Sequence, residues 1–238
     1  MSLILIIKIM KEKIIEMLEL QDKLNTMTSG ENWRDWVTNK GKIISWRRCM
    51  YMEMVEAIES TPWKHWKNVE WKTDIKNFQV EIVDIWHFLM SELLRNLSIE
   101  QSTLIIQKNL WETYPLRLPI FWDEEKNLML NDYLKPYEDF IRLSLKQEEN
   151  IDYLDDITKQ FFLCLDASAM NFIELYKLYI GKNVLNKFRQ DHGYKEWTYK
   201  KIWSNWEEDN VTMQQYIEDN EDFSFDDLYA FLEEKYNN

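Results

Sequence analysis

The stretch QVEIVDIWHFL, residues 79–89, decides the fold class of the chain. It predicts a helix in which apolar side chains surround Glu81 and Asp84 on nearly every side, so we expect a buried helix in an all-α protein. Glu81 and Asp84 are three residues apart and therefore share one face of the helix. A buried carboxylate is costly unless a counter-charge or a metal ion meets it, so these two acids are candidates for a functional site.

A second pair of acids has the same spacing in MYMEMVEAIES, residues 50–60, where Glu53 and Glu56 stand among apolar side chains. If the two helices pack antiparallel, all four carboxylates can point at one place. Four carboxylates without neighbouring His or Cys ligands suit a hard cation, so the pattern predicts a Mg²⁺ site between antiparallel helices. The alternative is that Arg47, Arg48 and nearby lysines neutralise the acids as buried ion pairs.

The composition also favours helices. The 238 residues include only four Gly and four Pro, whereas all-β folds and Gly-rich α/β nucleotide folds need many turn residues. The net charge of −13 argues against a nucleic-acid partner, because an acidic surface repels the phosphate backbone. Cys49 and Cys164 lie far apart in the sequence and predict two reduced thiols in a cytoplasmic protein.

The first ten residues, MSLILIIKIM, are apolar but do not predict a membrane segment. A membrane-spanning helix needs about 20 apolar residues, and a signal peptide needs a small-residue cleavage site that this stretch lacks. We interpret the stretch as the start of a helix, with Met10 as an alternative start of the chain.

Helical periodicity continues along the rest of the sequence. Ser98 and Gln101 have the spacing of a capping box and predict a new helix start. One compact domain over residues 1–238 is the simplest organisation, with 204–238 as an acidic, helical C-terminal segment. The helices are expected at about 11–27, 45–60, 74–97, 123–150 and 152–179, with a shorter one from near Lys182 and a last one from Ser224 to Tyr236.

Basic residues concentrate in GKNVLNKFRQDHGYK, residues 181–195. Lys182, Asn186 and Arg189 fall on one stripe of a helix, and Lys195 follows shortly after. A Lys/Asn/Arg face can hold phosphate oxygens, although an isolated stripe of this kind is more often a solvated helix face.

An aromatic and basic loop, TPWKHWK, occupies residues 61–67. Trp63 could stack on a base while a lysine meets phosphate; a Trp-anchored loop packed on the core is the alternative. His87 lies one turn after Asp84. A lone histidine on an apolar helix is usually a core residue, but its place beside the acidic face makes it a candidate for the site.

Five segments carry a family resemblance when they are taken in order. The paired-acid pattern is common to a superfamily, whereas the SWRR, WKHWK and DIWHF blocks and the basic block are more specific. Across residues 20 to about 203 the chain resembles the dimeric, all-α dUTPases, of the all-α nucleotide pyrophosphohydrolase superfamily that includes the MazG-type enzymes. The segments are LQDKLN (20–25), SWRRCMYMEMVEAIES (45–60), TPWKHWK (61–67), EIVDIWHF (81–88) and GKNVLNKFRQDHGYK (181–195).

The resemblance implies an enzyme that hydrolyses dUTP, and also dUDP, to dUMP and so limits uracil incorporation into DNA. It implies Mg²⁺ as cofactor, with more than one ion, and a homodimer. One of Glu53 and Glu56 would take the proton of the attacking water. The implied metal ligands are Glu53, Glu56, Glu81 and Asp84; the phosphate-binding residues are Lys67, Lys182, Asn186, Arg189 and Lys195; and the residues around base and sugar are Gln21, Asn25, Trp63 and His87.

Two alternatives stay open at this point. One is a MazG-like pyrophosphohydrolase that acts on another nucleotide such as dCTP. The other is a non-catalytic helical interaction protein, which loss of a metal carboxylate would have favoured; all four are present. Trp197 departs from the family pattern, in which a small residue is expected, and residues 207–238 carry no recognised motif.

Overall fold

The computed structural model describes residues 3–67, 72–113, 130–146, 150–168, 170–203 and 206–237. These residues form nine α-helices and one short 3-10 helix, and their only β-structure is two isolated bridges, so the predicted all-α class is confirmed. The tertiary contacts divide the chain into two compact units, Met1–Phe172 and Ile173–Asn238, which are described one at a time. The single domain expected from the sequence stays a prediction.

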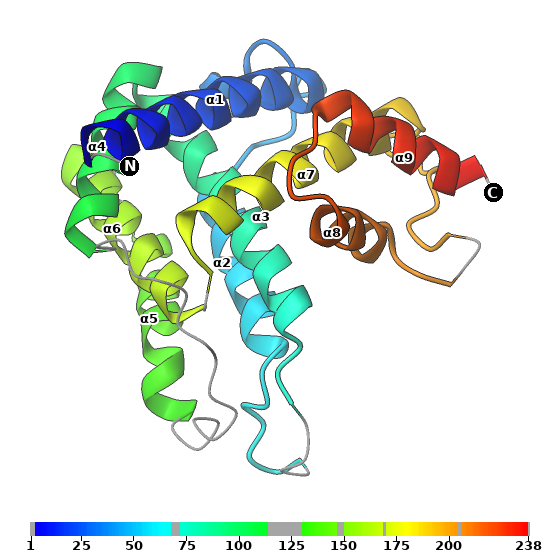
Figure 1. The fold of residues 1–238 in the computed structure, drawn as a ribbon. Coiled ribbons are helices and arrows are strands. Elements are labelled where there is room, and N and C mark those ends of the chain that lie inside the picture. Colours follow the sequence, from blue (N-terminus) through cyan, green and yellow to red (C-terminus); the bar gives the residue numbers. More distant parts are fainter. Residues whose placement is uncertain are drawn as a thin grey trace. The chain divides into compact units, whose positions relative to one another are not determined.

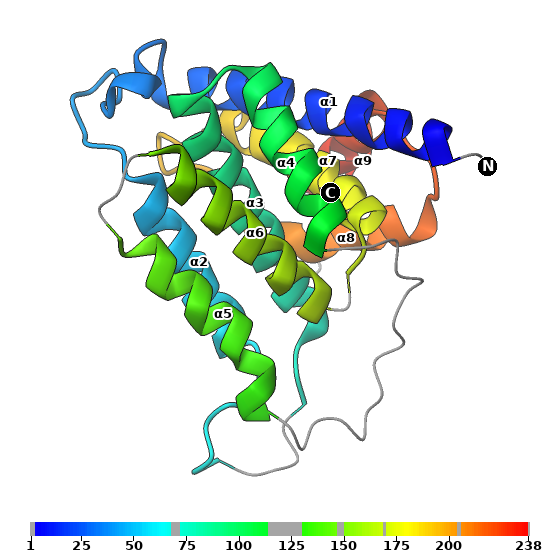
Figure 2. The same cartoon turned by 90° about the vertical axis from the view of Figure 1, so that its left-hand side faces the viewer.

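The first unit is a bundle around one central helix, α3, which packs against α1, α2, α4 and α6. Helix α5 covers α2 and α6, and α1 lies across α3 and α4 (Figures 1 and 2). The elements are α1 (Leu3–Ser29), η1 (Trp33–Asp35), α2 (Trp46–Glu59), α3 (Ile75–Asn96), α4 (Ile99–Thr113), α5 (Leu130–Ser144) and α6 (Ile151–Ala167).

The core of this unit forms along α3, as its apolar sequence predicts. Trp86 is fully buried, and its ring stacks on Phe161 of α6 with 4.8 Å between the ring centroids. The indole N–H of Trp86 points to the sulfur of Met17 on α1, at 3.4 Å. Because large side chains from three helices meet there, the axis and rotation of α3 are fixed by packing.

The second unit contains α7 (Phe172–Asp191, from Ile173 onward), α8 (Asp209–Asp219) and α9 (Phe225–Asn237). Its residues share one hydrophobic core. The buried members from α7 are Val184, Leu185 and Phe188, and the later segment adds Trp203, Met213, Leu228 and Leu232. The C-terminal residues are therefore part of the folded unit and complete the burial of α7.

Several sequence-based predictions about the helices are confirmed. Helices α1, α2 and α3 cover the expected ranges. The capping box at the start of α4 is present: the Ser98 N–H donates to Gln101 Oε1 at 3.0 Å, and the Gln101 N–H donates to Ser98 Oγ at 3.2 Å. Ser224 caps α9 by accepting the Asp227 N–H at 3.2 Å. In the described residues, no helix is both long and apolar enough to cross a membrane.

The predicted helix 152–179 is wrong, because the structure divides it between α6 and α7. Helix α6 ends at Ala167, where the Ser168 hydroxyl donates to the Leu165 carbonyl at 2.7 Å and competes for the helical backbone. The predicted start near Lys182 is also wrong, since Lys182 lies inside α7. Gly181 is tolerated there because Ile217 of α8 packs against it; an added Cβ would be 2.4 Å from Ile217 Cδ1.

The predicted helix 123–150 ends too late. Residues 123–129 lie outside the described part of the chain, and α5 ends at Ser144. Asn150 instead begins the next helix, because its side-chain oxygen accepts the Tyr153 N–H at 2.8 Å and caps α6.

Candidate active site

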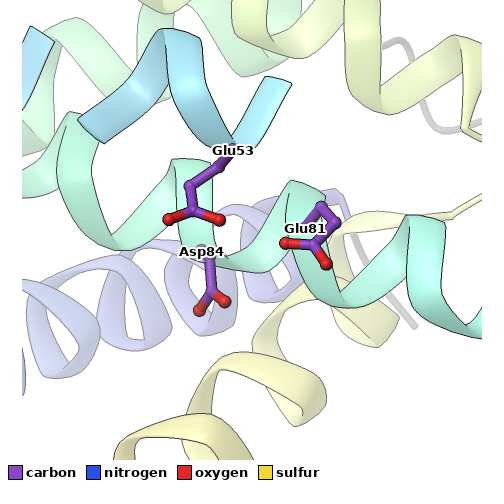
Figure 3. Close-up of side chains that lie close together, drawn as sticks. All are labelled: Glu53, Glu81 and Asp84. Atoms are coloured by element: carbon purple, nitrogen blue, oxygen red, sulfur yellow. The ribbon is translucent and has the colours of Figure 1, made fainter. Parts of the chain in front are cut away.

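Three carboxylates from two helices converge in the first unit. Glu53 of α2 lies beside Glu81 and Asp84 of α3, and one carboxylate oxygen of each residue is within 4.8 Å of the others. Figure 3 shows Glu53 reaching from its helix toward the α3 pair. Glu81 is buried, while Glu53 and Asp84 are half-buried, so the cluster lies at the edge of the core with access to solvent.

The cluster forms because α2 and α3 are antiparallel and held in register at both ends. At one end the Asp74 N–H donates to the Ser60 carbonyl at 2.9 Å. At the other end Arg47, early in α2, donates to Glu92, late in α3, at 3.0 Å. Arg95 also contacts the fully buried Glu92, at 3.3 Å, so two guanidinium groups balance this carboxylate.

The electrostatics of the cluster are those of crowded like charges. Burial, the neighbouring charges of Asp84, Glu81 and Glu56, and a hydrogen bond with Glu81 together raise the pKa of Glu53 to about 8. All of these influences disfavour the charged form of Glu53, so the ion-pair alternative is not supported at this residue. A donor set made of three carboxylates, all with oxygen atoms, fits a hard divalent cation.

Glu56, the fourth predicted metal ligand, is not part of this cluster. It lies one turn after Glu53 on α2, and its side chain is exposed to solvent. The structure thus brings together three of the four predicted carboxylates and places the fourth at the solvent edge of the same helix.

The cysteine beside the cluster does not provide a nucleophile. Burial and the charge of Glu53 raise the pKa of Cys49 to about 11, so its thiol is protonated near neutral pH. Burial also raises the pKa of Cys164 well above its ordinary value. Both thiols are free, as predicted.

Three of the predicted base- and sugar-binding residues meet in a buried polar network between α1 and α3. His87 Nδ1 is 2.6 Å from Gln21 Oε1, and Gln21 Nε2 donates to Asn25 Oδ1 at 2.9 Å. Ser91 completes the network: its hydroxyl oxygen accepts from Gln21 and Asn25, both at 3.0 Å. Sequence reasoning missed Ser91, although its position one turn after His87 on the same face was a usable signal.

Trp63 and Lys67 lie in the loop that follows α2. Trp63 is half-buried, its indole N–H donates to Glu59 Oε1 at 3.2 Å, and its ring meets Trp66 edge-on. Lys64 forms an ion pair with the same Glu59. Lys67 is exposed. These contacts join Trp63 to the end of α2 and to its own loop, and they decide neither base stacking nor packing on the core.

The predicted phosphate-binding stripe is on α7, in the second unit. Lys182 and Arg189 are buried and pair with residues of the C-terminal segment. Asn186 is half-buried and Lys195 is exposed. The alternative of a solvated helix face therefore does not hold for Lys182 and Arg189.

The partners of the stripe, Asp209 and Asn210, are the residues that sequence reasoning missed. They begin α8, and the EEDN run there looked like one more part of an acidic tail. Trp197, which departs from the family pattern, is 95% exposed and has a φ of 61°.

The sequence profile of the dUTPase family matches residues 13–194. No curated protein matches the chain at a significant level. The matched segment includes the carboxylate cluster, the polar network and α7, and it ends before Asp209. Because the match spans most of the 238 residues, the chain belongs to the dUTPase family, whose activity is that of a dUTP diphosphatase.

Proposed function

We propose that the protein hydrolyses dUTP, and also dUDP, to dUMP in a Mg²⁺-dependent reaction. The observation that carries the proposal is the convergence of Glu53, Glu81 and Asp84, within the segment that matches the dUTPase family. Three carboxylate ligands, which offer only oxygen atoms, suit Mg²⁺ better than a softer metal.

In the proposed reaction, Glu53, Glu81 and Asp84 would hold the metal, and Glu56 would be a fourth ligand. Bound Mg²⁺ would neutralise charge on the phosphate chain and lower the pKa of a water molecule. Glu53 or Glu56 accepts the proton of the attacking water. The water oxygen forms a bond to the β-phosphorus, and the bond from that phosphorus to the αβ-bridging oxygen breaks. dUMP leaves with pyrophosphate from dUTP, or with phosphate from dUDP.

The proposed phosphate ligands are Lys182, Asn186, Arg189, Lys195 and Lys67. A guanidinium group offers a planar fork of N–H donors to phosphate oxygens, whereas an ammonium group acts as a compact charge. The burial of Lys182 and Arg189 supports this role, because charge–charge interactions are stronger where water is excluded.

The proposed base-binding residues are Gln21, Asn25 and His87, with Ser91 added from their shared network. Amide side chains carry both a donor and an acceptor, and can therefore match the donor and two acceptors on the imide edge of uracil. Cytosine reverses two of these positions, so it would leave buried groups unpaired. Trp63 is proposed to pack against base or sugar.

Family membership also supports a homodimer, and a cytoplasmic location remains a proposal from the reduced cysteines. Light scattering after size-exclusion chromatography tests the homodimer. A mass close to twice that of the 29.3 kDa chain is expected, and a monomeric mass at working concentration would contradict it.

The function is tested with purified protein and a panel of dUTP, dUDP, dCTP and dTTP, each with Mg²⁺ and with EDTA. Release of dUMP from dUTP and dUDP in Mg²⁺ alone is expected. Turnover of dUTP in EDTA would contradict the metal requirement, and preferential turnover of dCTP would replace the proposed substrate.

A further inference from the structure

Asp209, the first residue of α8, accepts four hydrogen bonds, two of them from Arg189. Its carboxylate accepts Arg189 Nε and Nη2, both at 2.8 Å, the Tyr199 hydroxyl at 2.9 Å and the Asn210 N–H at 2.8 Å. A carboxylate offers about four lone-pair sites, so these donors saturate it. Because Nε and Nη2 of Arg189 both donate to this carboxylate, the plane of the guanidinium group is fixed.

Asn210 makes the equivalent contact to the second cation of the stripe. Its side-chain oxygen accepts Lys182 Nζ at 2.9 Å and lies 3.5 Å from Arg189 Nη2. Lys182 and Arg189 are seven residues apart, two turns of α7, and so share a face. Two adjacent residues of α8 therefore hold both cations of that face.

The segment that carries Asp209 and Asn210 belongs to the core of the second unit. Residues around Asp209 supply core side chains: Trp203 and Met213 pack with Phe188 of α7. Lifting Asp209 from Arg189 would expose this core, which argues against a segment that swings away to admit phosphate.

We propose that Asp209 and Asn210 are positioning residues that orient Arg189 and Lys182 for the phosphate chain of the substrate. The inference rests on the proposed function and gives the segment beyond residue 194 a part in it. Because Asp209 is 0% exposed and its oxygens are saturated, it acts through Arg189 and does not itself touch the nucleotide. Tyr199 supports the arrangement, since burial and the charge of Asp209 raise its pKa and keep its hydroxyl a donor.

The test is a double-mutant cycle on binding of α,β-imido-dUTP in Mg²⁺, measured by calorimetry. Arg189→Gln alone should weaken binding at least tenfold, and Asp209→Asn alone should weaken it about tenfold. In the Arg189→Gln background, Asp209→Asn should change affinity less than twofold, because Asp209 then has no guanidinium to orient. A merely structural residue would not show this dependence on Arg189.

Asp191→Asn is the matched control. Asp191 also accepts from a basic residue of α7, Lys187, and from a tyrosine hydroxyl, that of Tyr229 at 2.7 Å. Its loss should leave affinity within twofold of the native protein. If Asp209→Asn does not fold, Tyr199→Phe removes one of the four bonds and should weaken binding about threefold.

Three results separate the possibilities. Unchanged or tighter binding by Asp209→Asn overturns the inference; tighter binding would mean that Asp209 competes with phosphate. An equal loss in both backgrounds also overturns it. Native affinity in Arg189→Gln would instead contradict the proposed phosphate role of Arg189, whatever Asp209 does.

Discussion

In the first unit Glu53, Glu81 and Asp84 gather three like charges, and in the second unit Asp209 and Asn210 meet the cations of α7 one by one. Glu92 shows that the first unit can also balance a buried acid, since Arg47 and Arg95 both contact it on the same helix pair. The crowding at Glu53 is therefore local. We infer that the carboxylate cluster binds a cation from solution. The contacts of Asp209 and Asn210 instead fix the positions of Arg189 and Lys182 on α7.

The largest effect is expected from a change within the carboxylate cluster. Asp84→Asn removes a proposed metal ligand, so dUTP turnover should fall about 10³-fold or more while the protein stays folded. The measurement is pyrophosphate release together with the circular dichroism spectrum. Glu138→Gln, an exposed acid on α5, is the control and should retain native turnover. Near-native turnover by a folded Asp84→Asn protein would remove Asp84 from the site.

Replacing Glu92, the acid that is balanced by two arginines, should lower the stability of the protein. Glu92→Ala leaves Arg47 and Arg95 without their buried partner, so the free energy of unfolding should fall by about 3–5 kcal/mol. Urea denaturation measures the change. A loss below 1 kcal/mol would show that the two arginines find other partners and that Glu92 does not hold α2 and α3 in register.

Ionisation of Glu53 beside Glu81 and Asp84 should lower the stability of the metal-free protein. The pKa of Glu53 is about 8 in the folded protein and near its ordinary value of 4.5 in the unfolded chain. Between these values the folded protein binds more protons than the unfolded chain, so stability should decline as pH rises from about 4.5 through 8 and then level off. Glu53→Gln removes this decline and should gain about 1–2 kcal/mol at pH 9 in EDTA.

The same Glu53→Gln protein should also lose most of the stabilisation that Mg²⁺ gives the native protein at pH 9. Urea denaturation at pH 5 and pH 9, with and without Mg²⁺, provides both readouts. Lower stability of Glu53→Gln at pH 9 in EDTA would contradict the crowding of charge.

The smallest effect is expected in the buried polar network. Ser91→Ala removes a hydroxyl that contacts Gln21 and Asn25, so KM for dUTP should rise about fivefold with kcat nearly unchanged. Ser102→Ala is a matched control, because this serine of α4 is equally buried and its hydroxyl has no hydrogen-bond partner in the described residues. Equal kinetics of the two variants would leave Ser91 outside base recognition.

Local patterns in the sequence were enough for most of the fold. The apolar run around Glu81 predicted a buried α3, and the capping spacing of Ser98 and Gln101 predicted the start of α4. The break after Ala167 was missed because neither Gly nor Pro marks it. The predicted start near Lys182 was wrong because the packing of Ile217 against Gly181, which lets α7 continue through the glycine, joins residues far apart in the sequence.

The residues of the site also divide into those that the sequence predicted and those that it missed. Spacing and family resemblance named Glu53, Glu81 and Asp84, which the structure brings together, and Gln21, Asn25 and His87, which it also brings together. The partners Asp209 and Asn210 were missed because pairing across about 20 residues, from one helix to another, leaves no periodic signal. The exposed position of Glu56 likewise depends on how α2 rotates against α3.

The most direct test of the central claim is the position of a bound metal. Crystals of the protein grown with Mn²⁺, in place of Mg²⁺, and α,β-imido-dUTP should give an anomalous difference peak between the carboxylates of Glu53, Glu81 and Asp84. A map with clear density for the nucleotide and no anomalous peak among these three residues would contradict the account.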